Sequence, residues 1–478
     1  MNIAIIGGGM TGLTAGYMLS QSGHKVTVYE KENPLGGLAS AVNIGSEAID
    51  RFYHHIFVND SEILSLINEL NLNNRLDWYK PQNAVYADNT LHPFSTPLDL
   101  LLFKPLSLFH RIRLGIMVLS SAFIRDYSSF ESITAKEWII RHSGREVWRK
   151  VWEPLIKSKF DIDSNNISGA WIWNKLKLRG TSRGNCLRKE ILGYMDGAFI
   201  TIADELAKQI IHNNGDILTG QKVTSIARNE NGKVDVAVQD CKTSYDKVLF
   251  TGAPGLLSEI LKSAPDTSDI KQYRDQEIIA DDETLVPKAG EISSSEKAGS
   301  TLGVRDGRHI HTSYKESLDR ISYKANICLI LELSRSLSPY YWITVAQEGL
   351  PFVLIVEHTN LVGVKGYGSH VVYLSRYLDV SDPLYRAQDK DLIIEFINGL
   401  KKVFPDIKNE NIKKTTLSRA AFAQPVITVG YEKNIPDIKT PIEGLYLASM
   451  PQIYPEDRGL NYAVRLGQEA ANEILEDL

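Results

Sequence analysis

The N-terminal stretch "NIAIIGGGMTGLTAGYMLSQSGHKVTVYEK" constrains the fold of this chain more than any other segment. It predicts a buried strand over Ile3–Ile6, a glycine-rich turn, a helix with small and apolar residues at helical spacing, and a second strand over Lys25–Glu30. A strand, a tight turn, a helix and a second strand form the first unit of a doubly wound α/β sheet. The stretch therefore predicts a Rossmann-like α/β domain.

Three glycines and one acid in this stretch have the spacing of a dinucleotide-binding site. Gly7, Gly9 and Gly12 form a GxGxxG motif. The first glycine allows a tight turn, the second lets the backbone approach a pyrophosphate, and the third lets helix and strand pack closely. Glu30 ends the second strand, at about the 20-residue offset where an acid accepts hydrogen bonds from a ribose hydroxyl. An acid there favours FAD or NAD over NADP, whose 2′-phosphate it would repel.

A second glycine pair, in "KENPLGGLAS", follows Glu30 directly. Gly36 and Gly37 could provide another close approach of the backbone to a cofactor, which an NAD site does not ordinarily need. The alternative is an ordinary loop, because glycine pairs also mark turns. We favour the contact with a cofactor.

The composition argues against several classes of protein. A length of 478 residues predicts two or three domains, and 43% hydrophobic with 23% charged residues is ordinary for a soluble globular protein. The net charge of −5 and the lack of a long Lys/Arg block argue against nucleic acid as a partner. The longest weakly polar stretch, Leu114–Ile124, is shorter than the roughly 20 residues that cross a bilayer. Three cysteines without a CxxC pair favour a cytoplasmic protein without a metal site.

Three stretches together resemble the FAD-dependent amine oxidase and protoporphyrinogen oxidase superfamily. They are the N-terminal motif with "EKENPLGGLAS", the mid-chain "GQKVTSIARNENGKVDVAV" with "YDKVLFTGAP", and the C-terminal "GLYLASMPQIYPEDRGLNYAVRLGQEAANEIL". Two further stretches, "AIDRFYHHIFVND" and "LGYMDGAFITIADELA", resemble a bacterial branch often called protoporphyrinogen oxidase-like or amine oxidase-like proteins. The resemblance is dense over the flavin-binding part and thin over the substrate-binding part.

The resemblance implies FAD as the cofactor and gives positions of this sequence a role in binding it. The positions that correspond to contacts with the ADP part are Gly7, Gly9, Gly12 and Glu30. Gly36 and Gly37 would lie along the pyrophosphate and ribityl chain, and the backbone around Val223 would face the adenine.

The C-terminal turn "EDRGLNY" corresponds to the place where the family holds the flavin ring. Backbone N–H groups of Leu460 and Asn461, at the start of the last helix, would face the flavin N1/O2 edge. We expect Gly459 to adopt positive φ and to let the backbone approach the ring. Amine oxidases usually place an aromatic residue and an acid in this turn, whereas this chain has Gly459 and Asn461 at the nearest positions. An aromatic cage for an amine is therefore not implied.

The predicted strands and helices divide the chain into discontinuous domains. We expect an FAD-binding domain from residues 1–80, 195–262 and 415–478, and a mobile insertion over 263–319. Residues 81–194 and 320–414 would form a substrate domain, with a helical part followed by a mixed, mostly antiparallel sheet. Thr134 and Glu137 predict a capping box at one of its helices. The sheet would form the floor of a substrate cavity.

Three residues are candidates for a catalytic role. His54, in "RFYHHIF", could transfer a proton, although one packed and one capped or solvated histidine is the commoner arrangement of such a pair. Lys324 lies near the place where amine oxidases carry a lysine that holds a water near flavin N5, but an exposed lysine on an edge strand is the commoner occurrence. Arg458 could stabilise reduced flavin or meet an anionic substrate, or could simply pair with Asp457 in the turn.

The leading hypothesis is an FAD-dependent oxidoreductase that dehydrogenates a C–H bond of a small-molecule, possibly lipid-like, substrate by hydride transfer to flavin N5. One alternative is a redox-neutral flavoenzyme that acts on a nucleotide sugar, similar to UDP-galactopyranose mutase. The other is a non-catalytic binding protein similar to GDP-dissociation inhibitors, against which the complete glycine motif with Glu30 argues.

The aromatic and basic segment Pro93–Ile124 raises the question of contact with a membrane. It could lie on a membrane surface and admit a lipid-like substrate. We favour helices packed on the core with a basic outer face, which is the commoner arrangement.

Overall fold

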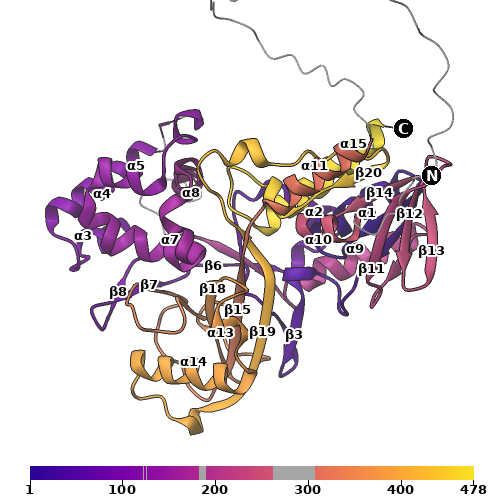
Figure 1. The fold of residues 1–478 in the computed structure, drawn as a ribbon. Helices are drawn as coiled ribbons and strands as arrows, with labels where there is room; N and C mark the ends of the chain where they lie inside the picture. The colour runs from indigo at the N-terminus through magenta and orange to yellow at the C-terminus, as the bar shows by residue number, and fades with distance from the viewer. Residues whose placement is uncertain (122, 125, 182–189, 262–306, 478) are drawn as a thin grey trace, which may run out of the picture.

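The structure is a computed structural model that describes residues 1–121, 123–124, 126–181, 190–261 and 307–477. Its described residues form two large sheets and a group of helices, each drawn from segments far apart in the sequence (Figure 1). Among the described residues, no helix is long and apolar enough to span a membrane.

A five-stranded parallel sheet forms the core of the Rossmann-like unit. Its order is β10-β2-β1-β14-β20, with bounds β1 (Asn2–Ile6), β2 (Lys25–Tyr29), β10 (Asp216–Leu218), β14 (Lys247–Phe250) and β20 (Leu445–Leu447). Strand β2 ends one residue before Glu30, which follows it directly. The predicted Rossmann-like α/β fold, assembled from separate segments, is confirmed.

Both faces of this sheet are covered, which explains why its strands are nearly continuous apolar runs. Ile3 and Ile5 of β1 face a core formed with helices α1 (Met10–Gln21), α2 (Ser61–Glu69), α9 (Ile200–His212) and α15 (Leu460–Glu476). Ala4 and Ile6 face the other way, toward the small sheet of β11 (Val223–Arg228), β12 (Val234–Val238) and β13 (Cys241–Tyr245) and the helix α10 (Pro254–Leu261).

Helix α11 (Gly307–Asp319) corrects one expectation. Residues 263–319 were predicted to be a mobile insertion, but 307–319 form a helix that contacts α10, and its Leu318 is fully buried in the core with Ala4 and Ile6. The prediction is wrong for this part because burial of a few apolar side chains compensates for weak periodicity. Residues 263–306 lie outside the described residues.

A seven-stranded, mostly antiparallel sheet forms the second unit, as predicted, and its role as the floor of a substrate cavity stays a prediction. Its order is β19-β15-β18-β17-β16-β7-β8, with bounds β19 (Ile412–Pro425), β15 (Tyr323–Leu333), β18 (His370–Leu378), β17 (Leu354–Glu357), β16 (Trp342–Val345), β7 (Asn83–Ala87) and β8 (Thr90–Pro93). All neighbours are antiparallel except β16 and β7. Strand β19 crosses the predicted domain boundary at residue 415, so its residues up to 425 belong to this sheet. Helix α14 (Asp389–Val403) packs Phe396 and Leu400 on one face.

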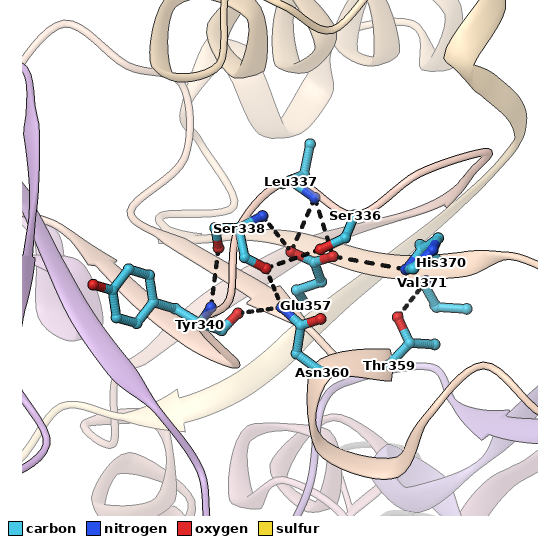
Figure 2. A network of polar contacts seen from close by, with 9 residues as sticks. All are labelled: Ser336, Leu337, Ser338, Tyr340, Glu357, Thr359, Asn360, His370 and Val371. Atoms are coloured by element: carbon cyan, nitrogen blue, oxygen red, sulfur yellow. Dashed lines mark hydrogen bonds and ion pairs between the residues drawn. The ribbon is translucent and has the colours of Figure 1, made fainter.

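A buried carboxylate fixes the loop between β15 and β16 (Figure 2). Glu357, at the end of β17, is completely buried and accepts hydrogen bonds from the backbone N–H groups of Leu337 and Ser338. Asn360 donates from its amide to the carbonyls of Ser338 and Tyr340, at 2.6 and 2.8 Å. These bonds satisfy backbone groups that the loop would otherwise leave unpaired, and they hold the start of β16 in register with the sheet.

The helical part packs around a cluster of aromatic and aliphatic side chains that includes Trp138, Phe160 and Trp171. Its helices are α3 (Pro97–Leu101), α4 (Leu108–Ser121), α5 (Ala135–Ser143), α6 (Arg145–Val147), α7 (Glu153–Phe160) and α8 (Gly169–Thr181). The predicted capping box at α5 is confirmed, because Thr134 Oγ1 accepts from the Glu137 N–H while the Glu137 carboxylate accepts from the Thr134 N–H.

Short elements connect the units. They are β3 (Ala41–Ile44), β4 (Glu47–Asp50), β5 (Ile56–Phe57), β6 (Leu76–Tyr79), β9 (Leu192–Met195), α12 (Thr359–Val362) and α13 (Pro383–Arg386). Strand β9 pairs with both β5 and β6, and thereby ties residue 192 onward to the N-terminal segment.

Candidate functional site

The N-terminal glycine turn is fixed by its own packing. Gly7 has φ +118°, and a Cβ on it would lie 2.4 Å from Thr251 Oγ1. A Cβ on Gly12 would lie 2.1 Å from the carbonyl oxygen of Gly7, so any side chain there would push helix α1 off the strand. A Cβ on Gly9 would meet no protein atom within 4 Å. The turn therefore has the two packing glycines of the motif, and a middle glycine whose open side suits the approach of a ligand.

Glu30 stabilises this turn through hydrogen bonds. Its side chain is buried, and its carboxylate accepts hydrogen bonds from the backbone N–H groups of Gly8 (2.7 Å, to Oε2) and Glu32 (2.8 Å, to Oε1). An ionised carboxylate has about four acceptor positions, so it can still accept from a ribose hydroxyl. The predicted contact of Glu30 with a ribose stays a prediction, and sequence reasoning missed its bond to the turn.

The second glycine pair lies against the first turn. The Gly36 N–H donates to the Gly8 carbonyl at 2.8 Å, and Gly9 and Gly36 form an isolated parallel bridge. Gly37 has φ +58°, and a Cβ on it would lie 3.3 Å from the Cα of Gly9. The two glycine segments, separated by more than twenty residues, thus form one backbone surface.

Val223 is the first residue of β11, which starts near Glu30, the residue after β2. Two residues before it, the Gln221 N–H donates to the carbonyl of Glu30 at 2.8 Å. This bond brings Val223 to the same end of the sheet as Glu30. Its predicted contact with an adenine stays a prediction.

The C-terminal turn differs from expectation. Gly459, the N-cap residue of α15, has φ −170° and ψ 168°, an extended conformation that any residue adopts, so the prediction of positive φ is wrong. A Cβ on it would make only an ordinary contact, 3.7 Å from a ring carbon of Tyr462. Leu460 is buried in the core of the Rossmann-like unit. Asn461 accepts from the Ile63 N–H at 3.0 Å and donates to Glu62 at 2.6 Å, so its side chain caps α2 and not α15.

Asp457 in this turn pairs with two lysines from the helical part. Its Oδ2 accepts from Lys159 and, at 2.6 Å, from Lys175, and both ammonium groups lie over the ring of Trp171. Burial would raise the pKa of the Asp457 carboxyl, but the two lysines outweigh burial and hold that pKa well below its usual range. The expected alternative, a pair between Asp457 and Arg458, is not what fixes the turn.

Arg458 reaches into the sheet of the second unit. Its Nε donates to Gln424 of β19 at 2.9 Å, and its guanidinium bonds to the Tyr377 hydroxyl and lies over that ring. These contacts hold one cation in a fixed orientation beside the residues described next.

A cavity of ≈ 20 Å³, with room for about one water molecule, lies where the two units meet. Its lining residues are Leu38, Phe52, Tyr53, His54, Asn326, Tyr377, Ala423 and Arg458. His54 Nδ1 and Asn326 Oδ1 are buried and have no hydrogen-bond partner among the described residues. Burial, with the nearby charges of Arg458 and His55, lowers the pKa of His54 to about 3, so its imidazole is neutral at pH 7. A neutral ring can exchange hydrogen bonds with a ligand, but it is a weak base.

Lys324 does not line this cavity. Its ammonium group is 1% exposed and lies 2.6 Å from Asp379 Oδ2 and 2.7 Å from Asp163 Oδ2. Burial lowers the pKa of Lys324, but the two carboxylates raise it more. The alternative of an exposed edge lysine is therefore wrong. A role near flavin N5 stays a prediction, and the structure adds that Lys324 joins the helical part to the sheet.

A larger groove of ≈ 1250 Å³ lies on the other side of Tyr377. It is bounded by α7, the segment 345–353 between β16 and β17, and α14, and its lining includes charged side chains such as Lys157 and Arg376. Tyr377 lines both the groove and the small cavity. Sequence reasoning missed Tyr377 and Asn326, because both lie in strands whose pattern marks them only as sheet residues. No group of three or more His, Cys, Asp or Glu in the described ranges is arranged to hold a metal ion.

Comparisons with known proteins place this fold among flavoproteins of one family. The family model described as "Flavin containing amine oxidoreductase" matches residues 10–274. The protein named "Probable zeta-carotene desaturase" from Synechococcus elongatus is 23% identical, over 100% of this chain and 99% of its own length. A crystal structure of a candidate protoporphyrinogen oxidase from Exiguobacterium sp. 255-15 superposes with a TM-score of 0.73 at 16% identity, and covers 100% of this chain and 99% of its own. Reduced UDP-galactopyranose mutase superposes with a TM-score of 0.71 at 14% identity, over 100% and 96%. At these identities the two structures show the shared fold alone.

Proposed function

Because the chain belongs to the flavin-containing amine oxidoreductase family, whose model matches more than half of its residues, we propose that it dehydrogenates a C–H bond of a small-molecule substrate by hydride transfer to flavin N5. FAD is the proposed flavin. A curated relative of similar length is named a desaturase, which supports removal of hydrogen from a carbon chain and a lipid-like substrate.

The residues of the N-terminal turn fit FAD. The open side of Gly9 leaves room for a pyrophosphate, and Glu30 keeps acceptor positions for a ribose hydroxyl. Gly36 and Gly37 would extend the same backbone surface along the cofactor. When bound, FAD would supply the hydride acceptor.

The observation that carries the proposal is the cavity between the two units. Leu38 follows the second glycine pair, Asn326 and Tyr377 come from the seven-stranded sheet, and Arg458 comes from the C-terminal turn. The cavity therefore adjoins both the predicted cofactor surface and the substrate sheet. Two of the buried polar atoms that have no partner among the described residues, His54 Nδ1 and Asn326 Oδ1, lie in this cavity, where a bound molecule, even a single water, could complete their hydrogen bonds.

Two side chains in this cavity have roles that follow from their environment. Arg458, held by Gln424 and Tyr377, would present a fixed positive charge to the cavity, which can stabilise negative charge on a bound substrate or reduced flavin. His54, neutral because its pKa is about 3, would orient the substrate through a hydrogen bond and would not compete as a cation. The aromatic walls of Phe52 and Tyr53 would exclude water from the reacting C–H bond.

A second candidate function is redox-neutral chemistry on a nucleotide sugar. The similarity of fold to UDP-galactopyranose mutase favours it, and the charged lining of the large groove is compatible with a polar substrate. A non-catalytic protein similar to GDP-dissociation inhibitors is disfavoured, because the chain belongs to an oxidoreductase family.

Anaerobic spectroscopy separates the two enzymes. The oxidised holoprotein is mixed without oxygen with a panel of unsaturated and partly saturated polyenes, porphyrinogens and amines, and loss of the oxidised flavin absorbance is followed. We expect at least one class to reduce the flavin, and Arg458→Ala to slow this reduction while the flavin stays bound. If no panel member reduces the flavin, and the dithionite-reduced protein interconverts UDP-galactopyranose and UDP-galactofuranose, the dehydrogenase proposal fails and the mutase replaces it.

A further inference from the structure

The outward face of helix α4 is apolar. Six large hydrophobic side chains on it or just past its end are exposed, and we call them the α4 face: Leu108 (61%), Phe109 (65%), Ile112 (48%), Ile116 (61%), Leu119 (55%) and Phe123 (85%). A soluble protein rarely concentrates so many exposed apolar side chains in one place, and such patches mark interaction surfaces.

The residues of the α4 face form a continuous stripe along one side of the helix. Successive residues of an α-helix turn by about 100°, so the five members inside the helix fall within one sector about 100° wide. Leu114 and Met117 are buried on the opposite side, against the rest of the helical part. Helix α4 therefore has two opposed apolar faces, one buried against the helical part and one exposed. The prediction of a basic outer face is wrong, and the basic residues lie at the edges of the stripe.

The neighbouring helix extends this surface. Leu98 of α3 and Leu102 just after it are 61% and 64% exposed. Arg111 ties the two helices together, because its guanidinium donates to the carbonyls of Leu101 and Leu106 at 2.6 Å. Helices α3 and α4 lie at the outer end of the helical part, away from α1 and β12 of the Rossmann-like unit (Figure 1). The exposed fractions show that the described residues leave the α4 face accessible to a large flat partner.

The charges around the stripe are positive. By the same rotation of about 100° per residue, Arg111 and Arg113 flank the stripe on its two sides. Both guanidiniums bond to backbone carbonyls, and neither has a carboxylate within ion-pair distance among the described residues. In the sequence no acid occurs between Asp99 and Asp126, whereas Lys104, Arg111, Arg113 and Arg125 fall in that interval.

This charge pattern discriminates between occupants of the face. A second copy of the chain across a two-fold axis would bring the same patch against itself, and would place the unpaired cations of one copy opposite those of the other. A bilayer with anionic lipids complements both features, because its interior accepts the apolar stripe and its headgroups attract the flanking cations. We propose that the α4 face docks this protein on the surface of a membrane that contains anionic lipid.

Vesicle co-sedimentation of the full-length holoprotein tests this proposal. The probes are vesicles of phosphatidylcholine alone and of phosphatidylcholine mixed with phosphatidylglycerol, each at low and high salt. We expect binding to the mixed vesicles that weakens at high salt, because the flanking cations are screened. Ile116→Glu should reduce binding by about tenfold or more, since a charge on the stripe opposes insertion. Lys104→Glu should reduce vesicle binding by a smaller factor, and the difference from wild type should disappear at high salt.

A matched control separates the face from hydrophobicity in general. Ile211 on α9 is 56% exposed, close to Ile116, and lies on the Rossmann-like unit. Ile211→Glu should leave vesicle binding unchanged, and thermal melts should show that both variants fold.

Three results would overturn the proposal. One is wild-type protein that binds neither kind of vesicle. Another is an Ile211→Glu variant that loses as much binding as Ile116→Glu. The third is a dimer, detected by light scattering, that Ile116→Glu dissociates while vesicles capture nothing, which would assign the face to a second copy.

Discussion

The N-terminal turn around Gly7–Gly12 and the C-terminal turn around Asp457–Asn461 appear alike in the sequence, since each combines glycine, an acid and the start of a helix. In the structure they are held in different ways. Gly12 is enclosed by the Gly7 carbonyl and the side chains of Thr251 and Ile5, whereas Gly459 is extended and open. Glu30 accepts from two neighbouring backbone N–H groups, whereas Asp457 accepts from Lys159 and Lys175 of the helical part.

The difference teaches how far a local pattern determines a site. In the N-terminal turn the closest backbone approach, between Gly12 and Gly7, and the bonds to Glu30 lie within the first strand, turn, helix and strand. The spacing of these residues therefore specifies most of the geometry, although Thr251 also packs against Gly7. In the C-terminal turn the partners come from another unit, and the turn alone does not indicate them. We therefore expect substitutions in the first turn to act on the fold and the cofactor together, and substitutions in the second to act through contacts between the units.

The largest effect is expected at Gly12. Gly12→Val would place a side chain 2.1 Å from the Gly7 carbonyl, and should destabilise the protein by about 3 kcal/mol or more and abolish FAD binding. Thermal melts and the FAD content of the purified protein measure both effects. Gly255→Ala is the control, because a Cβ on Gly255 meets no atom within 4 Å. A Gly12→Val variant that keeps its FAD and melts like wild type would remove packing as the reason for this glycine.

The next largest effect is expected at Asp457. Asp457→Asn leaves two largely buried ammonium groups without their anion, and should cost about 3 kcal/mol of stability at pH 7. Because the folded pKa of Asp457 lies below its unfolded value of about 3.9, the stabilisation is present above that pH and is lost as the pH falls further. Unfolding free energies of wild type and variant should therefore converge in acid.

Glu205→Gln is the control for Asp457→Asn. It removes one partner of the pair with Lys208, whose ammonium side chain is 71% exposed and remains solvated, and should cost less than about 1 kcal/mol. Equal losses from the two variants at pH 7, or a gap between wild type and Asp457→Asn that persists in acid, would contradict the account of the C-terminal turn.

Glu30→Gln should have an intermediate effect. The amide has one acceptor oxygen, so it leaves one of the two backbone N–H groups without a partner, and FAD binding should weaken by about 1 to 2 kcal/mol. Titration of the apoprotein with FAD measures the change. Glu32→Gln, at an exposed neighbouring side chain, should leave the affinity unaltered. Equal affinities of Glu30→Gln and wild type would exclude Glu30 from the site.

The smallest effect on stability is expected at Gly459. Gly459→Ala adds a methyl group in ordinary contact with Tyr462 and in an allowed conformation, so stability should change by less than about 0.5 kcal/mol. Melting temperature and FAD content are measured together. Unchanged stability with lost FAD would show that the cofactor itself approaches this glycine. A loss of stability as large as that of Gly12→Val would abolish the distinction between the two turns.

The same contrast decides what could be predicted from the sequence. The Rossmann-like unit, the strands of the second sheet and the capping box at Thr134 depend on short-range patterns and were predicted. The partners of Asp457 are 298 and 282 positions away, and those of Lys324 are also distant, so no local pattern indicates them. The outward face of α4 was predicted to be basic but is apolar. The prediction failed because an amphipathic helix ordinarily buries its apolar stripe.

The central proposal is that this member of a flavin-containing oxidoreductase family holds FAD at its N-terminal turn without a covalent bond. The most direct test is to denature the purified protein and to identify and quantify the released flavin against the protein concentration. We predict a yellow protein that releases FAD in stoichiometric amount, since the C-terminal turn has no Cys or His to tether a flavin. A colourless protein that cannot be reconstituted with FAD, or a flavin that stays attached after denaturation, would contradict this claim.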